Sequence, residues 1–325
     1  MNDTPHTDAK KNNHSPLAAD AYQGLKEAFE SALRKYLQPP GEFGSHFSDG
    51  RTSALHDSVG LPRLPSRVEK AVEYALLGEG KRIRPLLTLM TCEAAGGDHK
   101  NAMGASLAIE MIHTYSLVHD DLPAMDDDSL RRGRPTVHVK FDEATAVLAG
   151  DALLTDAFHV LTAYPCSLGD SARLEQIAFL SRAAGSSGMV LGQSLDMEAT
   201  GKDLGLSHVE HIHILKTGAL LGACFALGAL AANVSKTEAE TLFRAGTEIG
   251  LAYQILDDLL DCDTENGKTP GKDADSGKST YSSLGYKKAL AIAAEITEQA
   301  KSKIVAVCPD SRLEQFVDLL LTRKK

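Results

Sequence analysis

Residues 217–232 read Thr-Gly-Ala-Leu-Leu-Gly-Ala-Cys-Phe-Ala-Leu-Gly-Ala-Leu-Ala-Ala and form the most hydrophobic stretch of this 325-residue chain. The stretch is slightly short for a bilayer span and rich in alanine and glycine, so we predict a buried helix and no membrane insertion. From residue 65 onward, long Ala- and Leu-rich segments surround it, separated by short Gly, Pro and Asp interruptions. No convincing run of alternating β-branched residues is bounded by hairpin turns. The pattern predicts an all-α fold, with helices long enough to surround a central cavity.

The N-terminal part of the chain differs in character from the rest. Residues 1–20 are polar and unpatterned, and we expect a disordered tail there, followed by one domain over residues 21–325. Leu25, Phe29 and Leu33 follow the spacing of an amphipathic helix over residues 21–38. No apolar core of a secretory signal occurs near the start. The composition, 43% hydrophobic and 24% charged, is that of a soluble globular protein.

Charge and cysteine content exclude several functions. The formal net charge of −10 argues against a nucleic-acid partner, and a protein that binds anionic substrates at this charge must concentrate its cations locally. The cysteines are odd in number, scattered and never spaced as Cys-x-x-Cys, which argues against a disulfide framework or a zinc site. A reducing, cytoplasmic location is therefore expected. They are Cys92, Cys166, Cys224, Cys262 and Cys308.

The first of two acidic clusters spans residues 119–126, His-Asp-Asp-Leu-Pro-Ala-Met-Asp, and follows an apolar segment. Close carboxylates repel each other unless a cation neutralises them. Magnesium takes oxygen ligands, typically one or two carboxylates together with waters and substrate phosphates. Asp120 and Asp126 suit this role, and Pro123 should bend the backbone so that the two carboxylates converge.

The second acidic cluster spans residues 257–261, Asp-Asp-Leu-Leu-Asp, again after an apolar segment. Asp257 and Asp261 are four residues apart, which places them on one face of a helix. Either cluster alone is as consistent with a solvated surface as with a site. Two clusters of this kind, each at the end of a predicted buried helix, indicate two acidic motifs that together bind diphosphate through metal ions.

Short basic runs adjoin these acids. Residues 80–85, Gly-Lys-Arg-Ile-Arg-Pro, place Lys81 and Arg84 at a predicted helix start, and residues 131–135, Arg-Arg-Gly-Arg-Pro, follow the first acidic cluster. Guanidinium groups match phosphate oxygens bidentately, and helix N-termini favour anions. The pair 216–217, Lys-Thr, opens the apolar stretch, where a lysine is less easily solvated, although the threonine is equally suited to cap the helix. We expect these cations to bind anionic substrates.

Residues 264–280 follow the second acidic cluster and contain three glycines, one proline and three lysines. A solvated connector is one interpretation. The lysines beside a carboxylate–metal site favour the other, a mobile lid that closes on phosphate.

Taken together, these motifs resemble the trans-prenyl diphosphate synthase family over nearly the whole chain from about residue 21. The resemblance rests on residues 80–85, 119–133, 216–217, 254–258 and 277–281. It implies an all-α bundle around a deep prenyl pocket, normally a homodimer, in which three magnesium ions bridge the two acidic motifs and an allylic diphosphate. Two departures, Glu79 in place of the usual glycine and a longer loop over residues 41–60, do not touch the metal motifs.

By position, the resemblance also implies a role for each motif residue. The residues that would hold isopentenyl diphosphate are Lys81, Arg84, His113 and Arg132. Those that would contact the allylic diphosphate are Arg131, Lys216, Lys272 and Lys278. The direct metal ligands would be Asp120, Asp126 and Asp257, with Asp121 and Asp261 in support. Thr217 and Gln254 would line the place where the allylic cation forms, so the catalytic set is Lys216, Thr217, Gln254 and Asp257.

Tyr115 and Ser116 bear on the length of the product. Tyr115 lies five residues before Asp120, about 7–8 Å along a helix, where its ring would close the floor of the pocket beside the small Ser116. A core role for Tyr115 is the alternative, and helix geometry alone aligns Ser116 better with Asp120. The Tyr-Ser pair resembles that of bacterial-type farnesyl diphosphate synthases, which implies a fifteen-carbon product.

The expected reaction condenses isopentenyl diphosphate with dimethylallyl and then geranyl diphosphate to give farnesyl diphosphate and pyrophosphate. A geranylgeranyl diphosphate synthase is the alternative within the class. A terpene cyclase would not need the second anion site, and a non-catalytic subunit of a heteromeric synthase should have lost an acidic motif. The histidines at 208, 211 and 213 fit a transition-metal site loosely and a solvated helix face better.

Overall fold

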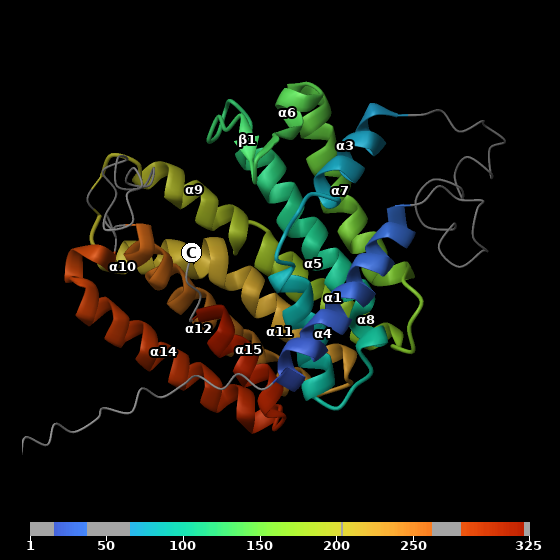
Figure 1. The fold of residues 1–325 in the computed structure, drawn as a ribbon, viewed down its shortest axis with the longest axis vertical. Helices are drawn as coiled ribbons and strands as arrows, with labels where there is room; N and C mark the ends of the chain where they lie inside the picture. The colour runs from blue at the N-terminus through green and yellow to red at the C-terminus, as the bar shows by residue number, and fades with distance from the viewer. Residues whose placement is uncertain (1–15, 38–65, 203, 262–280, 322–325) are drawn as a thin grey trace, which may run out of the picture.

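The computed structural model describes residues 16–37, 66–202, 204–261 and 281–321, and within these ranges the chain is a bundle of helices with one very short hairpin (Figure 1). The elements are α1 (Pro16–Leu37), α3 (Arg67–Leu76), α4 (Ile83–Ala94), α5 (His99–Asp120), β1 (Leu130–Arg131), β2 (Arg134–Pro135), α6 (Val137–Lys140), α7 (Glu143–Ala163), α8 (Asp170–Ala184), α9 (Met189–Ala199), α10 (Leu206–His213), the π-helix η1 (Ile214–Gly218), α11 (Ala219–Ala231), α12 (Lys236–Asp261), the 3₁₀-helix η3 (Tyr281–Leu284), α14 (Tyr286–Val307) and α15 (Ser311–Leu321). The all-α prediction is confirmed.

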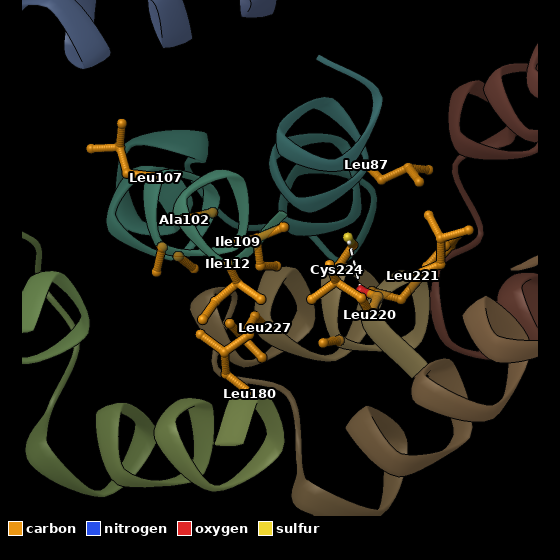
Figure 2. Close-up of a cluster of buried hydrophobic side chains, with 14 of the residues drawn as sticks. Leu87, Ala102, Leu107, Ile109, Ile112, Leu180, Leu220, Leu221, Cys224 and Leu227 are labelled. Carbon is orange, nitrogen blue, oxygen red and sulfur yellow. Dashed lines mark hydrogen bonds between the residues drawn. The ribbon is translucent and has the colours of Figure 1, made fainter. Parts of the chain in front are cut away.

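Helix α11 lies at the centre of the bundle, and all 13 of its residues are buried. It packs against α4, α5, α8 and α12, so an apolar surface on every side is what its position requires. Figure 2 shows Leu87 of α4, Ile112 of α5 and Leu180 of α8 around the α11 side chains, among them Cys224. Burying a leucine fully contributes about 1.5–3 kcal/mol. The buried helix predicted from residues 217–232 is therefore the core of the fold.

Two helical stretches are long and apolar enough to cross a membrane by length and composition, namely Glu143–Ala163 and Leu206–Ala231. The most hydrophobic part of the second is 78% buried, as expected for a core helix, whereas that of the first is 44% buried.

Arg82 connects four helical segments at one end of α4. Arg82 directly precedes the first residue of α4, has a φ of 52° and is 6% exposed. Its guanidinium donates to Glu110 of α5 at 2.6 Å and to Glu30 of α1 at 2.8 Å, and also to the carbonyl oxygen of Leu76 at 2.8 Å. Removing one partner of a buried pair of this kind costs about 3–5 kcal/mol. The middle cation of residues 80–85 therefore stabilises the fold.

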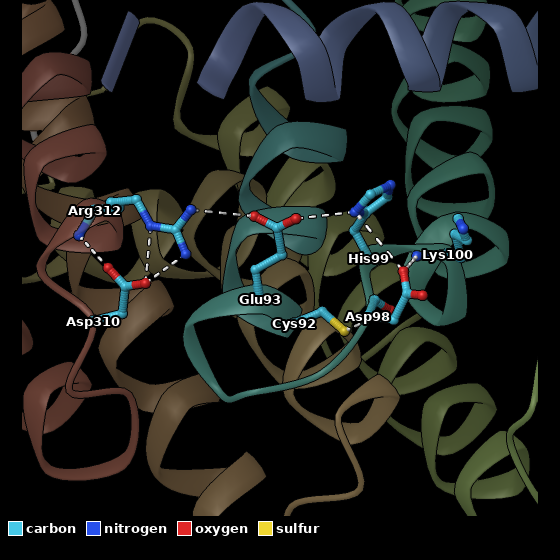
Figure 3. Close-up of polar contacts among 7 residues, drawn as sticks. All are labelled: Cys92, Glu93, Asp98, His99, Lys100, Asp310 and Arg312. Atoms are coloured by element: carbon cyan, nitrogen blue, oxygen red, sulfur yellow. Dashed lines mark hydrogen bonds and ion pairs between the residues drawn. The ribbon is translucent and has the colours of Figure 1, made fainter. Parts of the chain in front are cut away.

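The C-terminal helices attach through a chain of polar contacts (Figure 3). Arg312 pairs with Asp310 at 2.6 Å and approaches Glu93 of α4 at 3.8 Å. Glu93 in turn contacts the ring of His99, at the start of α5, at 2.9 Å. Because these groups are partly exposed, the network orients α15 on α4 more than it stabilises the fold.

Three local details differ from the sequence-based expectation. Helix α1 begins at Pro16, inside the segment expected to be disordered. Residues 130–135 form a two-stranded antiparallel hairpin, whose turn is possible because Arg132 and Gly133 both take positive φ, 52° and 75°. The pair Lys216–Thr217 does not open a helix but lies in the π-helical turn η1, inside a path that continues from α10 into α11.

Candidate active site

A cavity of about 450 Å³ lies between α5, α9 and η1, and its lining combines charged and polar groups with apolar side chains. Seven of the residues singled out from the sequence or its resemblance line it or its rim. They are Arg84, His113, Tyr115, Ser116, Asp120, Lys216 and Thr217. Helix α9, for which the sequence predicted no role, supplies the opposite wall with Met189, Val190, Gln193, Ser194 and Met197.

The first acidic cluster caps this cavity where α5 ends. Asp120 is the last residue of the helix, and the backbone N–H of Asp126 donates to its carbonyl oxygen at 2.8 Å. The chain therefore turns back after Pro123 and returns Asp126 to the helix end, as the sequence predicted.

Burial raises the pKa of Asp120 to about 6, against an ordinary value of 3.8. The nearby ammonium of Lys216 opposes this rise, and the Asp126 carboxylate adds to it. The ionised form of Asp120 is thus costly in the protein alone. A carboxylate held in this way is suited to a divalent cation, because the cation favours the charged form and oxygen is the ligand that magnesium prefers.

Asp121 points into the protein and is 3% exposed. Two nitrogens of Arg131 contact Asp121 Oδ1, Nε at 2.7 Å and Nη2 at 2.6 Å. Burial raises the pKa of Asp121, and this hydrogen-bonded pair partly offsets the rise. The pair fixes the hairpin residue Arg131 beside the first acidic cluster and uses two of the five N–H donors of its guanidinium.

A second, smaller cavity of about 80 Å³ adjoins the first and shares His113 with it. Its lining includes Arg132 together with three more arginines, at positions 82, 131 and 134. Arg84 Nη1 lies 3.4 Å from His113 Nε2, and Arg132 donates to the carbonyl oxygen of Glu79 at 2.6 Å. Burial and the arginine charges, Arg84 foremost, lower the pKa of His113 well below its usual value, so the imidazole is neutral. Lys81 lies exposed next to this group.

The π-helical turn η1 places two polar side chains on the cavity. Lys216 Nζ donates to Asp196 Oδ2 of α9 at 2.6 Å, and the Thr217 hydroxyl donates to the Gln254 amide oxygen of α12 at 3.1 Å. Thr217 therefore bridges two helices and does not cap one. A Cβ on Gly192 of α9 would overlap the backbone of Lys216, so only glycine permits this close approach.

Gln193 and Asp196 are polar cavity-side residues that sequence reasoning missed. Gln193 lines the cavity, and its buried Oε1 has no hydrogen-bond partner within the described part of the chain. The available signal was the spacing of Gln193 and Asp196, because residues three apart share one helix face.

The second acidic cluster lies at the end of α12. Asp257 is half-buried there, and Asp258 accepts hydrogen bonds from His213 and from the backbone of Tyr281. Asp261 ends the helix, and its side chain, like Lys272, Lys278 and the whole expected lid of residues 264–280, is outside the described residues. Among the side chains described, no group of three or more His, Cys, Asp or Glu is placed to hold a metal by itself. Magnesium needs fewer, since substrate phosphates complete its shell.

Tyr115 and Ser116 both line the large cavity from α5. Tyr115 is 5% exposed, and its ring meets that of His119 edge to face at 5.9 Å. The Ser116 hydroxyl donates to the carbonyl oxygen of His113 at 2.9 Å. Both positions proposed to control product length therefore face the same space.

Cationic side chains line two adjoining cavities of this all-α bundle, as the resemblance to the prenyl diphosphate synthases implied. The polyprenyl synthetase family model matches residues 65–307, and the chain belongs to this family. A farnesyl diphosphate synthase of Micrococcus luteus is 50% identical over 222 residues, 67% of this chain and 76% of the relative. A chloroplastic geranylgeranyl pyrophosphate synthase of Capsicum annuum is 40% identical over 303 residues, 91% of this chain and 82% of the relative.

Solved structures agree with this assignment over almost the full chain. The apo structure of an FPP/GFPP synthase from Zymomonas mobilis superposes with a TM-score of 0.75 at 34% identity, covering 94% of this chain and 97% of that one. A geranyltransferase from Helicobacter pylori, complexed with magnesium and isoprenyl diphosphate, gives a TM-score of 0.71 at 32% identity, covering 96% and 98%. The chain is thus a prenyl-transferring enzyme.

Proposed function

We propose that the protein condenses isopentenyl diphosphate with dimethylallyl and then geranyl diphosphate, and releases farnesyl diphosphate and pyrophosphate. The observation that supports this most directly is that Asp120, Lys216 and Tyr115 line one cavity. Relatives that carry the name farnesyl diphosphate synthase, at 44–50% identity, support the same product.

The donor set fits magnesium. Asp120, Asp126 and Asp257 would hold the metal, with Asp121 and Asp261 in support, and the family resemblance suggests three ions. When bound, magnesium neutralises the charge that develops on the departing pyrophosphate.

The protein's own cations hold the two diphosphates. Lys216 and Arg131 adjoin the first acidic cluster and would bind the allylic diphosphate, together with the lysines at 272 and 278. The second group, which contains a neutral imidazole and would bind isopentenyl diphosphate, is Lys81, Arg84, His113 and Arg132. Fixed donors of this kind stabilise charge without reorganising during the reaction.

Thr217 and Gln254 would line the place where the allylic cation forms. Their hydrogen bond presents oxygen lone pairs, which suit a nearby positive charge. Apolar side chains from α5 and α9 line the same cavity and would limit the access of water, which would otherwise capture the cation. The double bond of isopentenyl diphosphate then attacks, and a proton is lost to a base, for which the departing pyrophosphate is suited.

A homodimer in the cytoplasm is the assembly we propose. Helix α7 exposes the adjacent apolar residues Val147 (41%) and Leu148 (54%) together with Ala144, and the exposed Asp151 lies one turn further along. Neighbouring exposed apolar side chains of this kind often mark a subunit interface. Light scattering of the wild type should give twice the chain mass of 34.7 kDa, and Leu148→Asp should shift it toward the monomer.

The product assay tests the reaction. The protein is incubated with labelled isopentenyl and dimethylallyl diphosphates, with magnesium or with EDTA, and the products are separated by chain length. A dominant fifteen-carbon product that requires magnesium supports the proposal. A dominant twenty-carbon product would favour the geranylgeranyl alternative, which relatives of that name also suggest, and no incorporation would overturn the whole proposal.

A further inference from the structure

The last residue of α10, His213, forms a partly buried pair with the second acidic cluster. Its Nε2 lies 3.3 Å from Asp258 Oδ2, and the two side chains are 15% and 9% exposed. A carboxylate only accepts hydrogen bonds, so Nε2 carries the proton. This residue therefore does not belong to a solvated helix face, which is what the histidine spacing had favoured, whereas His211 on the same helix is exposed.

Tyr281 completes the cluster from the other side. Its backbone N–H donates to the same Asp258 oxygen at 3.0 Å, and its ring stacks on the His213 imidazole at 6.2 Å with an interplanar angle of 20°. The Tyr281 side chain is 4% exposed and hydrogen-bonds Glu210 of α10. Three segments, α10, α12 and η3, thus meet at one carboxylate.

This pair is one of two side-chain hydrogen bonds that join α12 to the segment from the end of α10 through η1. His213 pairs with Asp258, and one turn further along each helix Thr217 pairs with Gln254. The two pairs are four positions apart in each segment. Lys216 lies between His213 and Thr217 in the sequence, and Asp257 lies between Gln254 and Asp258. Lys216 is thus the sequence neighbour of Thr217 in one pair, and Asp257 is the sequence neighbour of Asp258 in the other.

Glycines leave the turn little other freedom. On one side Gly192 brings α9 against the backbone of Lys216. On the other, a Cβ on Gly250 of α12 would lie 2.5 Å from Gly218 Cα. This close packing on both sides restricts sideways movement of η1. Movement of η1 along α12 would have to break the two hydrogen-bonded pairs.

We propose that His213 is a positioning residue, which holds η1 in register with α12 so that Lys216 and Asp257 address the same diphosphate. This inference rests on the function proposed above. π-Helical turns recur at functional sites, and partners one step removed from a metal site typically change metal affinity or activity about 10–100-fold. His213 acts through its neighbours and does not itself touch substrate.

The test compares His213→Leu, which removes the hydrogen bond to Asp258, with His213→Gln, whose amide nitrogen reaches about as far as Nε2. His211→Leu, two residues away and exposed, is the matched control. In His213→Leu we expect kcat/KM for the allylic diphosphate to fall about 10–100-fold and the half-saturating Mg²⁺ concentration to rise, while KM for isopentenyl diphosphate changes little. His213→Gln should recover most of the loss, and His211→Leu should match the wild type.

A second measurement does not depend on turnover. Calorimetric titration of each variant with inorganic pyrophosphate in excess Mg²⁺ should show weaker binding in His213→Leu and unchanged binding in His211→Leu. Wild-type pyrophosphate affinity in a folded His213→Leu would overturn the inference, as would an equal loss in all kinetic constants that His213→Gln does not recover. If His213→Leu does not fold, His213→Asn, whose amide is too short to reach Asp258, replaces it. A wild type without turnover would instead overturn the proposed function, and the titration would still decide this inference.

Discussion

The ammonium of Lys216 lies 2.6 Å from a carboxylate oxygen of Asp196, so a side chain of α9 holds the cation of the π-helical turn. The same ammonium acts on Asp120, where it opposes the rise in pKa that burial causes. Lys216 thus stands between two carboxylates of different helices. Asp196 restrains it on one side, and the charge of Asp120 acts on it from the first acidic cluster.

Asp196→Asn should lower kcat/KM for the allylic diphosphate about 10–100-fold, because the lysine loses the charge that orients it. Steady-state kinetics with each substrate varied in turn will measure this. The control is Glu198→Gln, an exposed position on the same helix, which should match the wild type. Unchanged kinetics in a folded Asp196→Asn would show that packing against Gly192 alone places Lys216.

Tyr115→Ala should lengthen the product from fifteen to twenty or more carbons, because removal of the buried ring extends the cavity from its wall. The same change should lower stability by about 3–5 kcal/mol, the range for truncating a large buried aromatic residue. Chromatography of the dephosphorylated products will show the shift. The paired variant Ser116→Phe should shorten the product, because a ring at that position would fill part of the same cavity. An unchanged product length in Tyr115→Ala would show that the floor lies elsewhere.

Arg82→Leu should destabilise the protein by about 3–5 kcal/mol, because Glu110 would keep a buried charge without its partner. Urea unfolding measures the loss. Lys81→Leu, at the exposed neighbouring position, should leave the midpoint nearly unchanged while weakening the binding of isopentenyl diphosphate. Equal stability of the two variants would contradict the structural role of Arg82.

The basic run at residues 80–85 shows where sequence reasoning stops. Its composition and spacing predict a helix start rich in cations, and α4 begins there at Ile83. Which cation turns inward depends on the φ of 52° at Arg82 and on partners 28 and 52 residues away, Glu110 and Glu30. No local pattern encodes those distances, so the cation that stabilises the fold and the cations proposed to bind an anion look alike in the sequence.

The apolar core was predictable for the opposite reason. Residues 217–232 are apolar on every face, and only a central position in a bundle satisfies such a helix. The π-helical turn at Lys216 was not predictable, since one extra residue in a turn leaves the apolar pattern almost unchanged. The roles assigned to the site residues remain predictions, and Lys272 and Lys278 also lie outside the described residues.

Asp120 is required by the proposed activity, and its raised pKa makes the metal-free protein less stable near neutral pH. Its pKa is about 6 in the folded state and 3.8 in the unfolded state, so between these values the folded state binds more protons. The favourable contribution of the protonated carboxyl is complete below the lower pKa and is lost as the pH rises through about 6. Near neutral pH, the metal-free fold therefore carries the full cost of the ionised group.

Asp120→Asn should consequently raise the Tm of the metal-free protein at about pH 7.5, and the gain should shrink as the pH falls to about 5. The variant should lose activity by at least about a hundredfold, since a metal ligand is gone. Adding Mg²⁺ with inorganic pyrophosphate should raise the Tm of the wild type well above that of the variant, because only the intact carboxylate set binds the pair. A variant with the wild-type Tm at every pH would show that Asp120 is solvated and that its burial carries no cost.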